Sequence, residues 1–330
     1  MSKEINVIQY GIGPIGLMIT RFLSERERIK IVGAVDNDPL KIGKDLGELA
    51  GIHPLNIKVT GSLNSAMGIK PDAVILTTSS SLEKIKPQVL EILSHGINIV
   101  STCEELVYPW ITNPAAANEI DTAAKKCNAA VLSTGVNPGF LMDFLPLSLT
   151  AVCTKVNKIT VERIQDAQFR RIPFQKKIGA GLTVEEFHQK VKEGSIRHVG
   201  LTESIHMIAS GIGLQLDRTE DKIEPVIAEE TFANGSLVIE KGRCLGVKQT
   251  GRGLKDNTEV ITLNFTASVG QQETGERIII DGTPPVDLTI KNGINGDTAT
   301  CAIAVNAVSR IINASPGLRT MADIEPLTCI

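Results

Sequence analysis

The sequence of 330 residues contains few aromatic residues: tryptophan, tyrosine and phenylalanine together make up 3% of the chain. Pockets for bulky planar ligands usually have aromatic walls, so this composition favours a short, polar ligand. Basic residues are not in excess either, because 34 lysines and arginines stand against 37 acids. Nucleic acids and anionic membranes both require a concentrated positive surface, and the composition therefore argues against both as partners.

Long apolar runs and paired cysteines are also missing. No stretch approaches the roughly 18 apolar residues of a membrane span, and the run that follows Lys3 and Glu4 is too short for a signal peptide. The six cysteines are scattered without a CxxC pair, which favours reduced thiols over disulfides. The five histidines show no i,i+4 pair and no cysteine at ligand spacing, so no metal site is expected. We expect a cytoplasmic protein.

The length and the hydrophobic pattern predict two domains. Residues 1–135 alternate short apolar runs with segments of helical spacing, which is typical of βαβ units and a parallel sheet. In the second half, strict alternation such as that of residues 261–269 predicts an α+β domain with a mixed or antiparallel sheet. Helical spacing then returns, with Asp297 expected as the N-cap. The predicted domains are 1–135, completed by a C-terminal helix over 297–330, and 136–296.

A glycine-rich motif, GIGPIG, follows the first predicted strand and opens a helix that begins near Pro14. In such a motif Gly11 permits a tight turn, Gly13 lets backbone amides approach a pyrophosphate, and Gly16 lets the helix lie close to the strand. A glycine turn of an unrelated α/β protein would not be expected to combine these features with an acid about 20 residues further on. The sequence therefore predicts a Rossmann domain that binds a nicotinamide dinucleotide.

Asp36, at the end of the second strand, is that acid. It can accept hydrogen bonds from both ribose hydroxyls, whereas a 2′-phosphate would meet its negative charge, so NAD is favoured and NADP remains possible. Lys41 is the only cation nearby. The residues of this region that we expect to contact the cofactor are Gly11, Gly13, Pro14, Ile15, Gly16, Asp36 and Asn37.

Polar residues end two later strands at the same expected edge of the sheet. Thr77, Thr78 and Ser79 follow the apolar segment DAVIL and are expected to line the cofactor, although they can also cap the next helix. Cys103 follows the strand NIVST and is also expected to contact the cofactor.

Two carboxylates, Glu104 and Glu105, come directly after Cys103. We expect Glu105 to complement a helix dipole. Glu104 is the candidate for chemistry, because a carboxylate near a nicotinamide can bind a substrate ammonium, accept its proton and later activate water. The alternative is that Glu104 is also only a helix cap.

The segment GVNPGF, residues 135–140, is either a simple hinge or the place where Asn137 holds the nicotinamide and the substrate. In the second domain Arg163 and Gln165 share one face of a predicted strand. A cluster of basic residues follows, consisting of Arg170, Arg171, Lys176 and Lys177. This cluster is either a solvated surface or a carboxylate site at the domain interface. His198 is either structural or a contact of the second domain.

Taken together, these motifs resemble the dihydrodipicolinate-reductase-like family that contains 2,4-diaminopentanoate dehydrogenase and the native amine dehydrogenases. The resemblance covers essentially the whole chain and rests on GIGPIG, AVDNDP, STCEEL, GVNPGF, QKKIGAGLT and GINGDTAT. True dihydrodipicolinate reductases carry a histidine pair followed by KxDAPSGT. This sequence lacks the pair and has Lys177-Ile-Gly-Ala-Gly-Leu-Thr at that place, which argues against dihydrodipicolinate reduction.

The resemblance implies a reversible NAD(P)-dependent oxidative deamination in amino-acid degradation. The substrate would be 2,4-diaminopentanoate, the products 2-amino-4-oxopentanoate and ammonia, and the general base Glu104. The substrate side would comprise Asn137, Phe140, Arg163, Gln165, Arg170, His198 and Thr298, with Arg163, Arg170 and His198 serving the carboxylate. Two alternatives remain open: an amine dehydrogenase for small carboxylate-free amines or ketones, and a non-catalytic NAD-binding metabolite sensor. We expect a homodimer, because a sheet with one open face commonly pairs across a two-fold axis.

Overall fold

The computed structural model describes residues 4–168, 172–234 and 237–329. The chain divides into two compact units, of which unit 1 contains Met1–Phe140 and Asn295–Ile330, and unit 2 contains Leu141–Ile294. Within the described ranges, no helix has both the length and the apolar character that crossing a membrane requires.

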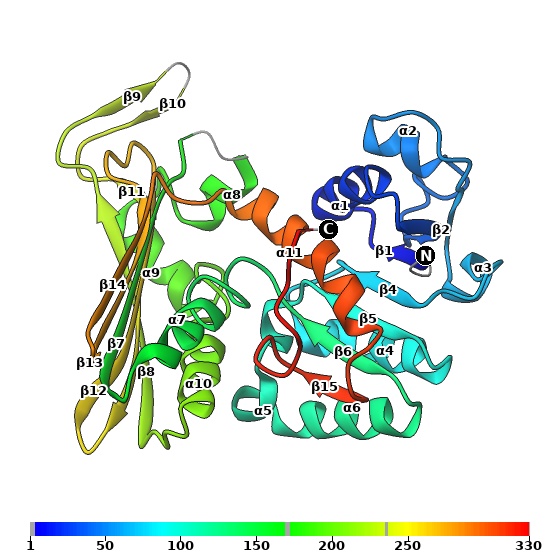
Figure 1. Ribbon diagram of the computed structural model, residues 1–330. Coiled ribbons are helices and arrows are strands. Elements are labelled where there is room, and N and C mark those ends of the chain that lie inside the picture. Colours follow the sequence, from blue (N-terminus) through cyan, green and yellow to red (C-terminus); the bar gives the residue numbers. More distant parts are fainter. Residues whose placement is uncertain (1–3, 169–171, 235–236, 330) are drawn as a thin grey trace. The chain divides into compact units, whose positions relative to one another are not determined.

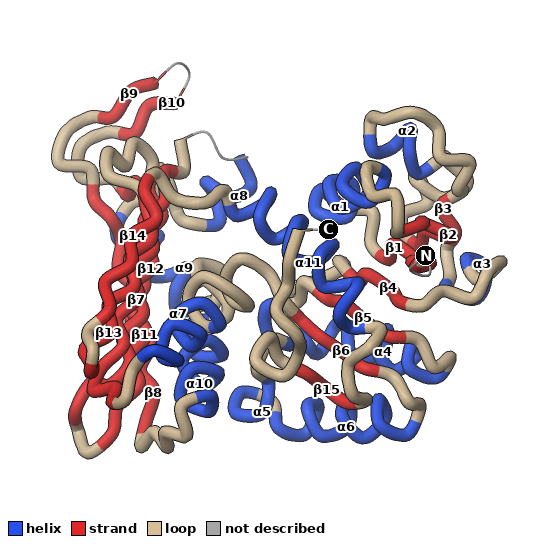
Figure 2. Tube along the Cα trace, in the orientation of Figure 1, coloured by secondary structure: helices blue, strands red, loops and turns tan. Residues whose placement is uncertain are grey.

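Unit 1 is built on seven strands that pair only in parallel. They are β1 (Ile5–Tyr10), β2 (Ile29–Val35), β3 (Val59–Thr60), β4 (Ala73–Leu76), β5 (Asn98–Ser101), β6 (Ala130–Ser133) and β15 (Gly317–Arg319). Their order in the sheet is β15-β6-β5-β4-β1-β2-β3 (Figures 1 and 2). β4 and β6 are buried at every position, as expected for a parallel sheet with helices on both faces. The order of the first six strands is that of a Rossmann fold, which confirms the predicted fold class.

The helices of unit 1 follow the predicted alternation with the strands. They are α1 (Pro14–Ser24), α2 (Leu46–Ala50), α3 (Leu63–Ala66), α4 (Leu82–Ser94), α5 (Pro109–Thr112), α6 (Pro114–Lys126) and α11 (Gly296–Ile311), with a short 3-10 turn, η1 (Glu104–Leu106). α4 buries Ile85, Val89 and Ile92, which lie on one side of the helix because they are three to four residues apart. These side chains belong to the core that lies against the sheet.

The last helix differs from the prediction at both ends. Asn295, and not Asp297, is the N-cap, because its side-chain oxygen accepts a hydrogen bond from the N–H of Thr298 at 3.1 Å. Helix α11 ends at Ile311, so the predicted helix over residues 297–330 is wrong. Pro316 has no N–H to continue a helix, and the chain after it forms β15 beside β6. Within unit 1, α11 packs against α1 and β5.

Unit 2 contains a six-stranded sheet with the order β14-β13-β7-β12-β11-β8. The strands are β7 (Lys155–Asp166), β8 (Arg218–Ile227), β11 (Cys244–Lys255), β12 (Thr258–Ser268), β13 (Gly275–Thr283) and β14 (Val286–Lys291). β7 and β12 pair in parallel and the other neighbours are antiparallel, which confirms a second domain with a mixed sheet.

Shorter elements complete unit 2. They are the helices α7 (Phe144–Leu149), α8 (Ile172–Lys177), α9 (Val184–Lys192) and α10 (Leu201–Gly211), the 3-10 turn η2 (Thr150–Val152), and the paired strands β9 (Phe232–Asn234) and β10 (Leu237–Ile239). Figure 1 shows α7, α9 and α10 on one face of the six-stranded sheet. The predicted alternation in β12 is present only in part: Ile261, Leu263 and Phe265 are buried and Asn264 and Thr266 are partly exposed, but Thr262 is buried as well.

Candidate active site

The glycine motif forms the turn between β1 and α1, and each glycine has a different reason to lack a side chain. Gly11 has φ +96°, a left-handed conformation that favours glycine. A Cβ on Gly16 would overlap the carbonyl oxygen of Gly11, so α1 can lie this close to the strand only with glycine there. Gly13 has no atom within 4 Å of where its Cβ would be. The backbone at the N-terminus of α1 is therefore open to a ligand, as a phosphate site requires.

Asp36 holds the next turn in place. Its carboxylate accepts hydrogen bonds from the N–H of Ile12 at 2.7 Å, from the N–H of Asp38 at 2.9 Å and from Lys41 Nζ at 3.1 Å. Although burial alone would raise it, these donors hold the pKa of Asp36 below its ordinary value. The carboxylate at the end of β2 is therefore negative at neutral pH, and Lys41 lies against it. Asn37, next in the chain, is exposed.

Thr77 fastens the glycine turn to the next strand. Its hydroxyl donates to the carbonyl oxygen of Gly11 at 2.8 Å and accepts from the side-chain amide of Gln9 at 2.9 Å. Thr78 bonds to Gln88 at 2.6 Å, and Ser79 accepts from the N–H of Ser81. Thr77 thus has a clear structural role in shaping the loop, and its predicted contact with the cofactor stays a prediction.

The two neighbouring glutamates have different surroundings. Glu105 accepts a hydrogen bond from the N–H of Leu82 at 2.9 Å, and so caps α4 where no serine or threonine side chain does. Glu105 therefore complements a helix N-terminus, as predicted, although the helix is α4 and not its own turn. Glu104 is half-buried on η1, and in the part of the chain that the structure describes its carboxylate makes no hydrogen bond or ion pair. Its carboxylate oxygens are therefore not engaged by these residues.

Cys103 anchors the turn that carries both glutamates. Its thiol is buried and donates to the carbonyl oxygen of Ser80 at 3.1 Å, and burial raises its pKa far above the ordinary value. Ser133, from the next strand, donates to the carbonyl oxygen of Cys103 at 2.6 Å. This thiol therefore stays protonated and helps to fix the main chain beside Glu104.

The segment 135–140 is held by the last helix. The N–H of Val136 donates to the hydroxyl of Thr300 on α11 at 3.1 Å, which joins the GVNPGF and GINGDTAT motifs. Gly139 has φ +124° and packs too closely on Gly135 for any side chain. Asn137 is buried and Phe140 half-buried, whereas Thr298 is exposed. Contacts with α11 and close glycine packing thus shape this turn, and the predicted role of Asn137 at the cofactor and the substrate stays a prediction.

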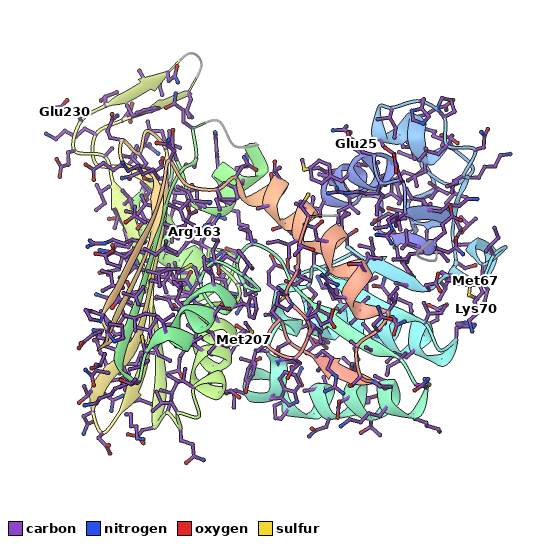
Figure 3. The ribbon with its side chains drawn as sticks, in the orientation of Figure 1. Glu25, Met67, Lys70, Arg163, Met207 and Glu230 are labelled. Carbon is purple, nitrogen blue, oxygen red and sulfur yellow. The ribbon has the colours of Figure 1, made fainter. Side chains whose placement is uncertain are left out.

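In unit 2, Arg163 lies on β7 (Figure 3). Its side chain is only 1% exposed. Its guanidinium donates to the carbonyl oxygen of Ile294 at 3.1 Å and lies 3.8 Å from the equally buried carboxylate of Glu276. Glu276 in turn accepts from the N–H of Ile294 at 3.1 Å. The amide of Gln165, turned with its oxygen toward the guanidinium, accepts from Arg163 Nε at 3.1 Å. This buried network holds the main chain at the end of unit 2.

His198 is held on two sides in the same unit. Gln249, which is fully buried, accepts from its N–H at 2.6 Å and donates to its carbonyl oxygen at 3.1 Å. The imidazole stacks on the ring of Phe265 with 4.2 Å between the centroids. Burial lowers the pKa of His198 to about 3, and the positive charges of Lys177 and Arg163 act in the same direction. Arg170 lies outside the described residues.

Gln249 and Glu276 were missed in the sequence because only the folded chain brings them to their partners. The register of β13 on β7 pairs Glu276 with Arg163, and Gln249 on β11 meets His198 in the segment before α10. One signal was present. Each occupies an inward position of its strand, where the alternation otherwise places apolar residues such as Val247 and Ile278. A polar side chain at a buried strand position usually has a polar partner. These two positions could therefore have been recognised as members of buried polar networks.

Two family models and a curated relative show the family of this chain. Residues 5–106 match the family model "Dihydrodipicolinate reductase, N-terminus", and residues 140–330 match "2,4-diaminopentanoate dehydrogenase C-terminal domain". The chain is 31% identical to a 2,4-diaminopentanoate dehydrogenase of Acetoanaerobium sticklandii over 335 residues, which cover 98% of this chain and 94% of that protein. The chain belongs to the 2,4-diaminopentanoate dehydrogenase family.

Amine dehydrogenases are similar over the same length. The family member described here is 20% identical to one from Streptomyces virginiae, with 97% of this chain and 96% of that protein covered. Its fold matches the amine dehydrogenase of Mycobacterium smegmatis with a TM-score of 0.86 and 22% identity, over 99% and 97% of the two chains. The protein is therefore a dehydrogenase of the amine dehydrogenase family with an NAD(P)-binding fold, and the predicted resemblance is confirmed.

Proposed function

We propose that this enzyme catalyses the reversible NAD(P)-dependent oxidative deamination of 2,4-diaminopentanoate to 2-amino-4-oxopentanoate and ammonia, in amino-acid degradation. The observation that carries the proposal is the similarity to the Acetoanaerobium sticklandii enzyme along essentially the whole chain. The position of Glu104 supports it, because this carboxylate follows β5 at the edge of the parallel sheet where ligands of such folds bind.

The residues of unit 1 fit a nicotinamide dinucleotide. The open backbone at Gly13 would receive the pyrophosphate, and the carboxylate of Asp36 would accept from the ribose hydroxyls. Thr77, Thr78, Ser79, Cys103 and Asn137 stay predicted contacts. When bound, the oxidised nicotinamide accepts a hydride. The negative charge of Asp36 favours NAD, and Lys41 beside it would make NADP acceptable.

Glu104 would act twice in the proposed reaction. It first accepts a proton from the ammonium on C4, so that the nitrogen lone pair can form a C=N bond as the C4 hydrogen leaves with its electron pair. Once this proton has passed to solvent, the negative carboxylate stabilises the positive charge of the iminium. Glu104 then accepts a proton from the water that attacks C4 and returns it to the amine nitrogen. The C–N bond breaks as the hydroxyl proton passes to the departing ammonia, which leaves the ketone and ammonium. Substrate, oxidised cofactor and water thus give ketone, ammonium, reduced cofactor and one proton.

Further parts of the proposal concern unit 2 and assembly. His198, Gln165, Arg163 and Arg170 remain candidates for the substrate side, and Arg163 is better suited to positioning because it is buried in its own ion pair. Phe140 and Thr298 also remain candidates. We further propose that unit 1 is the dinucleotide-binding domain, that unit 2 is the substrate and dimerisation domain, and that the enzyme is a homodimer, which light scattering would test.

The neighbouring glutamates give a matched test of the base. Glu104→Gln should lower kcat by about 100- to 10,000-fold, the usual contribution of a general base, and leave the melting temperature unchanged. Glu105→Gln should weaken the cap of α4 and lower the stability by about 1 kcal/mol, while most of the turnover is retained. Steady-state NADH formation and thermal unfolding measure both variants. Wild-type turnover in Glu104→Gln would remove Glu104 from the mechanism.

An amine dehydrogenase for carboxylate-free substrates is the second candidate, because such enzymes are similar over the whole length. Butan-2-amine keeps the reacting carbon and its methyl group but has neither the carboxylate nor the second amine. Wild-type kcat/KM should be at least tenfold higher for 2,4-diaminopentanoate, since a charged group then contributes to binding. Equal values would favour the second candidate.

A further inference from the structure

A cavity in unit 2 lies between the end of α8 and the strands β11 and β12. It is a small hollow that is partly open to solvent. Its walls include two phenylalanine rings, the imidazole described above, and two cations: Phe174, Phe265, His198, Lys177 and Arg197. Ile178 and Val247 complete the lining, so no carboxylate lines it in the described part of the chain.

The imidazole side of this cavity is fixed and uncharged. Gln249 holds the main chain of His198 from both sides and is itself anchored to the carboxylate of Asp221 at 2.8 Å. Stacking on Phe265 fixes the ring plane. Because its pKa is lowered to about 3, His198 is neutral at physiological pH and offers a hydrogen-bonding group without adding charge.

The two cations differ in their surroundings. Burial raises the pKa of Asp221, and the positive charge of Arg197 partly opposes this shift. Lys177 makes no hydrogen bond or ion pair with any residue that the structure describes. Other lysines of the unit do, since Lys158 pairs with Glu259 and Lys222 with Glu224. The positive charge of Lys177 at the cavity is therefore not compensated by a neighbouring acid.

We propose that this cavity binds the carboxylate of an amino-acid substrate and that Lys177 is the specificity-determining cation. The proposal rests on the proposed function and names the group that separates a diamino acid from a simple amine. A carboxylate suits an uncompensated ammonium, and the phenylalanine and aliphatic walls beside Lys177 exclude water from the ion pair. Arg163 is not needed for this role, because its guanidinium is held by Ile294 and Glu276.

Lys177→Ala in the full-length enzyme is the test, with Lys176→Ala as the matched control. Lys176 precedes it on α8, is also exposed and does not line the cavity. Each variant is assayed on 2,4-diaminopentanoate and on 1,3-diaminobutane, which replaces only the carboxylate by hydrogen. Lys177→Ala should raise the KM for 2,4-diaminopentanoate about 10- to 100-fold and leave the KM for 1,3-diaminobutane unchanged. Lys176→Ala should alter neither by more than about twofold.

Binding supplies a readout that does not depend on turnover. 2-Aminopentanoate keeps the carboxylate and the C2 amine but has no C4 amine, so it is titrated by calorimetry in the presence of NADH. Its affinity should fall about 10- to 100-fold in Lys177→Ala and be largely restored in Lys177→Arg. An unchanged affinity, or equal losses of kcat/KM on both diamines, would overturn the proposal.

The two proposals fail in different ways. If the wild type oxidises neither diamine, the proposed function is wrong, and the titration still decides the role of Lys177. Binding that depends on Lys177 then supports the carboxylate site, whereas binding that is absent or independent of Lys177 overturns it. If the wild type oxidises 2,4-diaminopentanoate and Lys177→Ala has the same KM and the same affinity for 2-aminopentanoate, the proposed function stands and the proposed carboxylate site is wrong.

Discussion

The two units build their functional groups in opposite ways. In unit 1 the groups come from one continuous turn and from the residues just after parallel strands, so their positions can be recognised in the sequence. In unit 2 each group is held by a distant partner: His198 by Gln249, 51 residues away, and Arg163 by Ile294, 131 residues away. A site of the first kind is visible as a motif, whereas a site of the second kind depends on contacts between residues far apart in the sequence.

The largest effect is expected from the long-range network of unit 2. Glu276→Gln leaves the buried Arg163 charge without its partner and should lower the free energy of unfolding by about 3–5 kcal/mol. The next residue on β13 is the control, because Arg277 pairs with Asp287 at 2.7 Å where both are about half-exposed. Arg277→Met should cost about 1 kcal/mol or less. Urea denaturation measures both, and equal losses would show that unit 2 does not depend on this network.

In the glycine turn of unit 1, single substitutions should change stability and NAD binding. Gly16→Ala places a methyl group onto the carbonyl oxygen of Gly11 and should cost about 2–3 kcal/mol, with loss of NAD binding. Gly13→Ala meets no atom within 4 Å and keeps φ at −80°, so its stability should stay within about 0.5 kcal/mol of the wild type. Its NAD affinity should still fall, because the methyl group enters the space for the pyrophosphate. Normal NAD binding by Gly13→Ala would break the assignment of the turn.

Acid should weaken unit 2 through His198. Its pKa is about 3 in the folded chain against an ordinary value of 6.5. Between these values the unfolded chain binds a proton that the folded chain does not, so stability is full above about pH 6.5 and is lost as pH falls toward 3. His198→Gln should remove about 1 kcal/mol per pH unit of this slope in that window. His206→Gln, at a partly buried histidine whose pKa is also lowered, should remove less. Unfolding at pH 7, 6 and 5 measures the slopes, and identical slopes in all three proteins would contradict the burial of His198.

The smallest effect concerns the cofactor. Lys41 lies 3.1 Å from Asp36 and 3.5 Å from Asp38, on the rim of unit 1. Lys41→Ala should lower kcat/KM for NADP about fivefold and leave NAD unchanged, because only NADP adds a phosphate there. Lys44→Ala, at an exposed lysine of the same loop, is the control. Parallel losses with both cofactors would show that Lys41 stabilises the loop and does not select the cofactor.

The contrast between the units also explains which parts of the fold and of the site could be predicted from the sequence. The glycine turn, Asp36 and the helix over 82–94 were predictable, since they depend on local conformation and periodic burial. The cap of α4 was not, because Glu105 reaches it from another strand end. Asp297 was mistaken for a cap because asparagine and aspartate cap equally well, and only the geometry selects Asn295.

The most direct test of the account follows the hydrogen on C4. The enzyme is given NAD together with 2,4-diaminopentanoate that carries deuterium at C4. We expect deuterium on the nicotinamide of the NADH formed, one ammonia per NADH, and 2-amino-4-oxopentanoate as the product. Mass spectrometry of the NADH and of the product measures this in one experiment. NADH without deuterium, or a product that has lost its C2 amine, would contradict the central claim.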